Sequence, residues 1–392
     1  MDQLASPAEA DRLLRATLDP LPTENVAFQA GLHRTLRQSL LADRPFPPFD
    51  RIMMDGIACR HRDLPSSLTI QGLHPAGAPE PDALKPKHCW QVMTGAVLPP
   101  GCDTVIPVEE LLLTETTATP KINYRPSSGQ FIHQKGSDCE AGTILLEKGT
   151  RLNPAHLSLA ATIGTIEISV TKQPKISIIT TGDELIPASA NPLPHQIRQS
   201  NGDLLYAALQ THSQRIHLQH LPDSPAVLQP AIETAITYSS LVLITGGISK
   251  GTRDFIRPLL ETLIGPPTFH GLSQRPGKPL AYWEPTDTSP PILALPGNPN
   301  STLTTFHRYV RPTLDLLAGT PTYEPVALPL AEPLSPHPKL TLFLPATLKP
   351  EGTLQVDPPQ NSGDIPAFLH ATGIIEVPPG NQTVTSAVYR TI

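Results

Sequence analysis

Three short apolar runs in the second half of the chain each lead into a loop that mixes glycine with polar or acidic residues. The runs are residues 176–180, 241–245 and 292–295. Such runs are typical of parallel strands buried on both faces, and open parallel sheets bind ligands beyond the carboxyl ends of their strands. The loops are Thr181-Gly182-Asp183-Glu184, Gly246-Gly247-Ile248-Ser249-Lys250-Gly251-Thr252-Arg253-Asp254 and Pro296-Gly297-Asn298-Pro299. We expect the three loops to meet at one ligand-binding edge.

The residue types in these loops suit phosphate chemistry. Gly246, Gly247 and Gly251 let backbone N–H groups turn toward an anion, and a helix expected after the third loop points its positive end to the same place. The carboxylates of Glu184 and Asp254 would repel a phosphate unless a divalent cation lay between them. Mg²⁺ is commonly held by one or two carboxylates and substrate phosphate oxygens, so the pattern predicts a magnesium-assisted phosphate or phosphoanhydride site. Ordinary turn chemistry explains any one loop equally well, and only the occurrence of three favours a site.

Composition limits the class of protein. The chain has 392 residues, 39% of them hydrophobic and 16% charged, which predicts a globular protein of several domains. Its formal net charge is −6 and its basic residues are scattered, so we do not expect a nucleic-acid partner. The N-terminus lacks a basic stretch followed by an apolar one, no long apolar segment follows, and four cysteines have neither zinc-site nor disulfide-scaffold spacing. We expect a cytoplasmic protein that does not contact a membrane.

The order of the patterns predicts an α/β multidomain fold, with a central doubly wound domain between β-rich N-terminal and C-terminal domains. Apolar residues recur at helical spacing from residue 7 to 41 around a break at 20–22, so we expect two helices there. Helices are also expected at 202–210, 224–235 and 301–317, the last ending at Gly319. The predicted domains are a discontinuous helical and linker domain at 1–49 and 132–171, a small β-rich domain at 50–131, the α/β domain at 172–320 and a C-terminal β-rich domain at 321–392.

The loops also carry motifs of a known family. Residues 246–255 resemble the Gly-Gly-Val-Ser-x-Gly-x-x-Asp-Tyr/Phe signature of the molybdopterin molybdenumtransferases of MoeA type, and residues 295–299 match their Leu-Pro-Gly-Asn-Pro loop. Residues 275–279 resemble Lys-Pro-Gly-Lys-Pro, residues 177–185 match the strand that ends in Thr-Gly-Asp-Glu-Leu, and a Ser-Asn pair stands at 200–201. The chain is likewise similar to the E domain of gephyrin.

Further matches lie outside the α/β region. Residues 54–58 resemble Met-Asp-Gly-Tyr-Ala, and residues 93–95 with 100–105 match Met-Thr-Gly-Ala and its Pro-x-Gly-Ala-Asp continuation. Residues 136–138 fit a Gly-Glu-Asp element, and residues 360–363 fit a C-terminal serine segment. The resemblance therefore spans nearly the whole chain in the order of the family, which turn composition alone does not explain.

The resemblance implies a fold, a reaction and partners. The α/β domain would be a MogA-like three-layer domain that binds molybdopterin. The enzyme would insert molybdate into adenylyl-molybdopterin with release of AMP, in molybdenum cofactor biosynthesis, and would use Mg²⁺. It would be a homodimer whose cleft joins domains of two subunits, with a molybdopterin adenylyltransferase and molybdoenzyme apoproteins as candidate partners.

Residue roles carry over only at matching positions. The resemblance implies catalytic or cleft-lining roles for Asp55, Thr94, Asp138, Glu184, Asp254 and Lys278. Glu184 and Asp254 would hold the metal, and Lys278 would contact phosphate or molybdate. The substrate-binding candidates are Thr181, Gly182, Asp183, Ser200, Asn201, Gly246, Gly247, Ser249, Gly251, Arg275, Pro296, Gly297, Asn298 and Ser362. Asp223, whose alignment with an acidic family position is uncertain by one residue, is a second-rank candidate.

The sequence also departs from the family. His133 stands where an arginine is usual, Arg275 replaces a lysine, and Pro345 with Ala346 falls where a substrate-side arginine is often found. Neither a neutral histidine nor a proline makes the bidentate anion contacts of a guanidinium, so we expect an effect on substrate affinity rather than on the fold.

Two other functions remain open from sequence. The chain could be a molybdopterin-binding paralogue or scaffold without turnover, as the missing arginines would allow. It could also be a molybdopterin adenylyltransferase or nucleotide pyrophosphatase, because related α/β domains share the Gly-Gly-x-Ser loop. The Met-Asp-Gly and Met-Thr-Gly motifs argue against the second reading.

Overall fold

The computed structural model describes residues 4–248, 254–321, 325–361 and 363–392. The chain forms two compact units. We call the first, Met1–Gln38 with Gly149–Pro154 and Glu167–Ile392, the main unit, and the second, Ser39–Lys148 with Ala155–Ile166, the inserted unit. This two-part division is coarser than the four domain ranges expected from the sequence, which stay a prediction.

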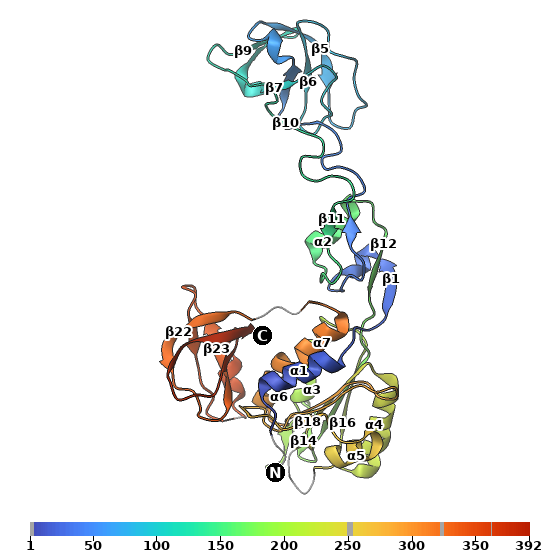
Figure 1. The fold of residues 1–392 in the computed structure, drawn as a ribbon, viewed down its shortest axis with the longest axis vertical. Helices are drawn as coiled ribbons and strands as arrows, with labels where there is room; N and C mark the ends of the chain where they lie inside the picture. Colours follow the sequence, from blue (N-terminus) through green and yellow to red (C-terminus); the bar gives the residue numbers. More distant parts are fainter. Residues whose placement is uncertain (1–3, 249–253, 322–324, 362) are drawn as a thin grey trace. The chain divides into compact units, whose positions relative to one another are not determined.

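The main unit is built on a six-stranded sheet in the order β16-β13-β17-β21-β20-β18. Its two edge strands, β16 and β18, are labelled in Figure 1. The first four strands are parallel and the last two run antiparallel, so the three parallel strands predicted from the apolar runs are confirmed. The strands are β13 (Ile176–Thr181), β16 (Ile216–Leu221), β17 (Leu241–Thr245), β18 (Phe269–His270), β20 (Ala281–Trp283) and β21 (Ile292–Leu295).

Helices cover both faces of this sheet. Alternate residues of β17 enter two different hydrophobic clusters: Leu241 and Leu243 pack with α1, α3 and α7, whereas Val242 and Ile244 pack with α4 and α5. The doubly wound domain predicted from sequence is therefore confirmed. The helices are α1 (Pro7–Thr17), α3 (Asn201–Leu209), α4 (Pro225–Tyr238), α5 (Ile256–Ile264), α6 (Pro299–Thr305) and α7 (Arg311–Ala318).

Local sequence accounts for where these helices begin and end. The side chain of Ser6 accepts a hydrogen bond from the Glu9 N–H at 3.1 Å and Pro7 occupies the first turn of α1, a favourable helix start. After α6 the chain passes through a π-helical segment, η4 (Phe306–Val310), into α7. Gly319 then adopts a left-handed conformation with φ of 70°, which ends the helix as predicted.

A buried arginine joins three elements of the main unit. Arg308, in η4, is 2% exposed. Its guanidinium donates to both carboxylate oxygens of Asp11 in α1, at 2.5 and 2.7 Å, and its Nε donates to Glu376 in the C-terminal domain at 3.0 Å. The C-terminal domain is thereby tied to the helices that cover the sheet.

The C-terminal domain is a small β-barrel. Its strands follow the order β23-β24-β22-β26-β25, and β25 pairs again with β23, which closes the sheet. β19 (Gln274–Arg275), from the α/β domain, pairs with β23. The remaining elements are β22 (Ala327–Leu334), β23 (Thr341–Leu348), β24 (Leu354–Val356), η5 (Ile365–Phe368), β25 (Gly373–Val377) and β26 (Val384–Thr391).

The inserted unit contains a second six-stranded sheet, in the order β7-β4-β6-β5-β9-β8. Adjacent residues of β4 point to opposite sides, since Ala58 enters one apolar cluster and Ile57 and Cys59 enter another. These strands are β4 (Gly56–Cys59), β5 (Leu68–His74), β6 (His88–Val92), β7 (Thr104–Pro107), β8 (Leu111–Leu113) and β9 (Thr117–Pro120). Outside the sheet lie β2 (Leu40–Leu41), β3 (Arg51–Ile52), β10 (Ile132–His133), β11 (Ile144–Leu146), η2 (His61–Asp63) and η3 (Val108–Glu110); α2 (Pro154–Thr162) crosses the boundary between the units.

The second helix predicted before residue 41 is wrong. The segment instead forms β1 (Thr23–Ala27) and η1 (Phe28–Gly31), and β1 pairs with β12 (Glu167–Thr171). The local spacing of Val26, Leu32, Leu36 and Leu40 suited a helix, but pairing with a strand about 140 residues away decided the structure. Among the described residues, no helix is long and apolar enough to span a membrane.

Candidate active site

The carboxyl ends of the three parallel strands lie in one row. In the sheet register, Thr245 of β17 stands between Thr180 of β13 and Leu295 of β21. The loops that begin at Thr181, Gly246 and Pro296 therefore leave the sheet side by side, as the sequence predicted.

Glycine is required at the first position of the second loop. Gly246 has φ of 99°, and a Cβ atom there would lie 2.2 Å from the carbonyl oxygen of Thr181. An L side chain would meet both backbone strain and a clash with the neighbouring strand. The close approach keeps the ends of β13 and β17 together.

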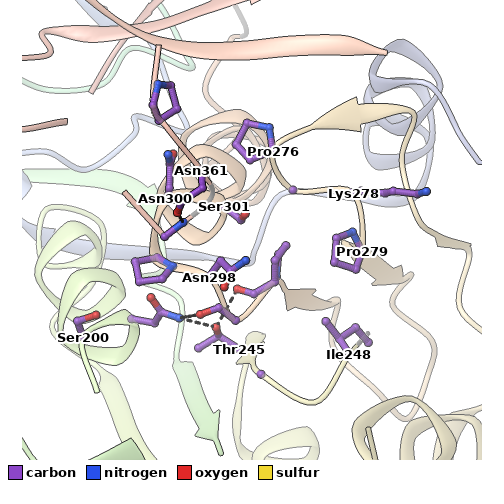
Figure 2. A pocket seen from close by; sticks show the side chains of 18 of the residues that line it. Ser200, Thr245, Ile248, Pro276, Lys278, Pro279, Asn298, Asn300, Ser301 and Asn361 are labelled. Atoms are coloured by element: carbon purple, nitrogen blue, oxygen red, sulfur yellow. Dashed lines mark hydrogen bonds between the residues drawn. The ribbon is translucent and has the colours of Figure 1, made fainter. Parts of the chain in front are cut away.

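Asn201 ties the other two strand ends together. Its Nδ2 donates to Thr245 Oγ1 at 3.2 Å and to the Gly297 carbonyl at 2.7 Å, and Thr245 Oγ1 donates to the Pro296 carbonyl at 3.2 Å (Figure 2). Asn201 is 9% exposed, so these bonds are sheltered from water. The start of α3 thus fixes the geometry of both loops.

These loops and the C-terminal barrel line a pocket of about 1320 Å³. This volume exceeds the roughly 300–1,000 Å³ of a typical small-molecule pocket and suits a ligand of dinucleotide size. Acidic and basic side chains both line it: Glu184, Asp223, Asp254, Arg198, Arg275 and Lys278. The barrel contributes a mostly apolar wall of Leu334, Leu340, Leu342, Phe343, Leu344, Pro358, Pro359 and Asn361, with Gly363.

Hydrogen bonds hold the acidic side of the pocket. Thr181 Oγ1 donates to the carboxylate of Asp223, and the Asp223 N–H donates to Asp183 Oδ1 at 3.0 Å. Asp223 therefore lies in the pocket, while Asp183 supports its loop from outside the lining. Asp223, the second-rank candidate, is therefore better placed than Asp183 to contact a ligand in the pocket.

The inserted unit carries a separate polar pair. Asp55 Oδ1 accepts hydrogen bonds from the Thr94 N–H at 2.6 Å and from Thr94 Oγ1 at 2.7 Å. The backbone N–H, followed by the hydroxyl, lowers the pKa of Asp55 against a small opposing effect of burial. Asp55 is thus ionised at neutral pH and fixes the turn at Thr94.

His133 bridges two charged residues of the same unit. Its Nε2 lies 2.7 Å from Asp138 Oδ1 and its Nδ1 lies 3.0 Å from a guanidinium nitrogen of Arg51, the residue opposite it in the β3–β10 pair. A guanidinium only donates, so Nδ1 accepts and the Nε2–H donates to Asp138. The imidazole of His133 therefore links Asp138 to Arg51.

Comparison with known proteins decides the family. Residues 5–164 match the family described as "MoeA N-terminal region (domain I and II)", and residues 177–316 match the one described as "Probable molybdopterin binding domain". A molybdopterin molybdenumtransferase of Synechocystis sp. is 34% identical over 383 residues, covering 96% of each chain. The chain belongs to the molybdopterin molybdenumtransferase family.

A further relative agrees with this assignment, and a solved structure agrees with the fold. Gephyrin of Dictyostelium discoideum is 32% identical over 339 residues, which cover 76% of this chain and 47% of gephyrin. The crystal structure of a molybdopterin biosynthesis moeA protein from Pyrococcus horikoshii has a TM-score of 0.84 at 24% identity and covers 100% of both chains. The motif resemblance and the predicted fold class are both confirmed.

The structure brings together most of the substrate-binding candidates of this molybdopterin molybdenumtransferase family member, but not all. The candidates that line the pocket are Thr181, Gly182, Glu184, Ser200, Asn201, Gly246, Gly247, Asp254, Arg275, Lys278, Pro296, Gly297 and Asn298. Ser249, Gly251 and Ser362 lie outside the described residues. Asp55, Thr94 and Asp138 belong to the inserted unit. The functional roles of the candidates in all three groups stay predictions.

Glu184 and Asp254 carry the kind of oxygen ligand that magnesium takes in proteins, and the magnesium site stays a prediction. Both line the pocket, and the described residues include no group of three or more His, Cys, Asp or Glu side chains placed to hold a metal. Mg²⁺ commonly keeps several waters and binds one or two carboxylates together with substrate phosphate oxygens, so it needs fewer protein ligands than a metal held in a full protein cage.

Some pocket residues escaped the sequence reasoning. Thr245 ends an apolar strand and Asn300 stands directly before the helix predicted at 301–317, so neither carried a signal of its own. The barrel residues that line the pocket were missed, because the sequence of a strand does not show which of its residues face another domain. Pro345 and Ala346, where the family often has an arginine, are buried within β23 and offer no charge.

Proposed function

We propose that this chain inserts molybdate into adenylyl-molybdopterin and releases AMP. The observation that carries the proposal is the large pocket at the ends of β13, β17 and β21, which holds both the glycine loop and the two carboxylates. The chain that forms it is similar to a molybdopterin molybdenumtransferase over 96% of its length.

The protein would act by positioning and electrostatics. Backbone N–H groups of the Gly246 loop bind the phosphates, and the exposed cations Arg275 and Lys278 offset the charge of the pyrophosphate and molybdate. The strand ends are held rigidly by Asn201, so the bound groups keep their relative orientation. Water would cleave the phosphoanhydride bond, so that AMP leaves with one phosphate and the other phosphate stays on molybdopterin, while the two dithiolene thiols replace two molybdate oxygens, which leave as water.

Magnesium would sit between Glu184 and Asp254. When bound, it supplies positive charge to the pyrophosphate oxygens. Without the ion, the two carboxylates would repel the negatively charged substrate. Because both carboxylates would hold the ion, both residues would be needed for substrate binding as well as for turnover.

We also propose a homodimer in which the inserted unit completes the site of a second copy. Asp55, Thr94 and Asp138 carry family motifs yet belong to a different unit from the pocket. Three exposed methionines, Met53, Met54 and Met93, stand next to Asp55 and Thr94 in sequence, with 48%, 37% and 43% of their surface accessible. Flexible apolar side chains around a polar pair suit a surface that another molecule covers.

The cytoplasm is the proposed site of action. All four cysteines are free thiols, and Cys59, Cys89 and Cys102 are buried, as suits a reducing compartment. A molybdopterin adenylyltransferase as supplier of substrate and molybdoenzyme apoproteins as acceptors are the proposed partners. Cell fractionation and co-purification test these assignments.

The activity test measures AMP release from adenylyl-molybdopterin with Mg²⁺, with and without molybdate. The natural protein should release AMP only when molybdate is present, and Glu184→Ala or Asp254→Ala should abolish release. Glu115→Ala, an exposed acid of the inserted unit, is the matched control and should retain it. Tight binding without molybdate-dependent release would reject the transferase and leave a binding paralogue.

The dimer is tested by mixing two inactive variants. Asp55→Asn removes one half of the proposed composite site and Glu184→Ala the other half. If each site uses both chains, a dimer of the two variants contains one intact site, so co-refolded protein should recover AMP release. A monomeric mass by sedimentation, or no recovery from a demonstrated mixed dimer, would refute the shared site.

A further inference from the structure

Asn300 presents an unpaired amide to the pocket. It is the second residue of α6, lines the pocket and is only 2% exposed. Neither its Nδ2 nor its Oδ1 has a hydrogen-bond partner within the described part of the chain. Figure 2 labels it among the lining side chains.

Leaving this amide unpaired is costly. A buried amide without a partner destabilises a protein because it loses water and gains nothing in return, and such groups are rare in native structures. Two threonines of the same helix are paired locally: Thr302 Oγ1 donates to the Pro296 carbonyl and Thr305 Oγ1 to the Ser301 carbonyl, both at 2.7 Å. An unpaired donor and acceptor on a pocket wall therefore point to a ligand that completes them.

The chemistry of the side chain defines what it can recognise. A carboxamide offers one acceptor next to two donors, which pairs in two bonds with the edge of a planar heterocycle that places a donor beside an acceptor. A phosphate oxygen could accept from the Asn300 Nδ2 but offers no donor to its Oδ1, so a phosphate would satisfy only half of the amide. Asn201 adds a second buried acceptor to the same pocket, since its Oδ1 is also without a partner among the described residues.

We propose that Asn300 binds the hydrogen-bonding edge of a ring of the substrate and so helps to select it. This inference rests on the proposed function, in which the substrate carries two such rings, an adenine and a pterin. Both present adjacent donors and acceptors, and the apolar barrel residues that line the pocket suit the faces of either ring. Asn300 thus acts in substrate specificity.

The test compares Asn300→Leu with a matched variant of the same helix. Leucine keeps the branched shape of asparagine and removes the hydrogen bonds. Thr304→Val is the control, because the Thr304 hydroxyl is also buried without a partner but does not line the pocket. Binding of AMP, of a free 6-hydroxymethylpterin and of adenylyl-molybdopterin is measured by calorimetry, and thermal stability is measured without ligand.

Both variants should match or exceed the thermal stability of the natural protein, since each removes an unpaired buried group. Only Asn300→Leu should weaken binding of adenylyl-molybdopterin, by about 10- to 100-fold for two lost hydrogen bonds. A parallel loss for AMP alone assigns the adenine to Asn300, and a loss for the pterin alone assigns the pterin.

Two results would overturn the inference while leaving the proposed function intact. One is unchanged affinity of Asn300→Leu for adenylyl-molybdopterin. The other is a marked loss of stability that Thr304→Val does not share, because the amide would then have a structural partner. If the natural protein binds none of the three probes, the proposed function itself fails, and this inference fails with it.

Discussion

Acid should destabilise this protein through two partly buried histidines, His212 and His307. Burial, together with the positive charge of Arg311, lowers the pKa of His212 and of His307 to about 4, and Arg151 and His33 add to the effect at His212. In the unfolded chain both imidazoles titrate near 6.5. Between pH 6.5 and about 4 the unfolded state therefore binds protons that the folded state does not, so stability is complete above this window and falls as the pH is lowered through it.

The size of the effect follows from the pKa values. At about 1.4 kcal/mol for each pKa unit, a fall from 6.5 to about 4 corresponds to about 3.5 kcal/mol at each imidazole. This is large beside a typical stability of about 5–15 kcal/mol. Asp315 opposes it in part: burial raises its pKa, so the folded state holds a proton there above pH 3.8 and gains stability at the acid end.

Urea unfolding followed from about pH 7.5 to about pH 4.5 measures the loss. The double variant His212→Gln with His307→Phe should lose less free energy of unfolding over this range than the natural protein. His195→Gln, at an exposed position, is the control. If the double variant and the natural protein lose the same free energy, the two imidazoles do not cause the acid sensitivity.

Three other substitutions test features of the fold and the site. Gly246→Ala should lower the free energy of unfolding by more than about 2 kcal/mol, because the added Cβ would clash with the Thr181 carbonyl and the residue would keep a positive φ. Thermal unfolding checks this: a lower midpoint is expected, and an unchanged midpoint contradicts it. Arg308→Met should cost about 3–5 kcal/mol in urea unfolding, since it leaves two carboxylates without their buried partner; a loss below about 1 kcal/mol would count against it. His133→Ala should lower kcat/KM for AMP release by about tenfold, whereas His133→Arg, which keeps a donor to Asp138, should not; equal rates would show that the bridge is dispensable.

Local sequence was sufficient for the parts of the fold that bury both faces. The runs at β13, β17 and β21 are apolar throughout, which only strands covered on both sides require, and their loops had to meet because the strands are parallel. Local sequence failed at β1, where helical spacing coexists with a strand partner far along the chain. No local pattern reports a pairing of that kind.

The candidate site likewise contains residues that local sequence could predict and residues that it could not. Glycine and acidic residues at strand ends could be predicted, because their chemistry and their place in the sheet are both local properties. Asn300 could not, since an asparagine in the first turn of a helix is ordinary and only burial without a partner distinguishes it. From the sequence, His133 in place of an arginine indicated a missing guanidinium. In the structure the guanidinium of Arg51, on the opposite strand, contacts the His133 ring, which the sequence did not predict.

The position of α1 has a consequence for how the protein is made. Ala10 and Leu14 of this helix pack in one apolar cluster with β13, β17 and β21 and with Leu314 of α7. On the ribosome, the helix emerges roughly 300 residues before α7, a delay of roughly 15 to 60 s at about 5–20 residues per second. The two apolar clusters on the faces of the inserted unit's sheet use residues 52–132. All residues of this sheet are therefore translated well before α7. The apolar face of α1 therefore has no complete set of packing partners until α7 has been translated.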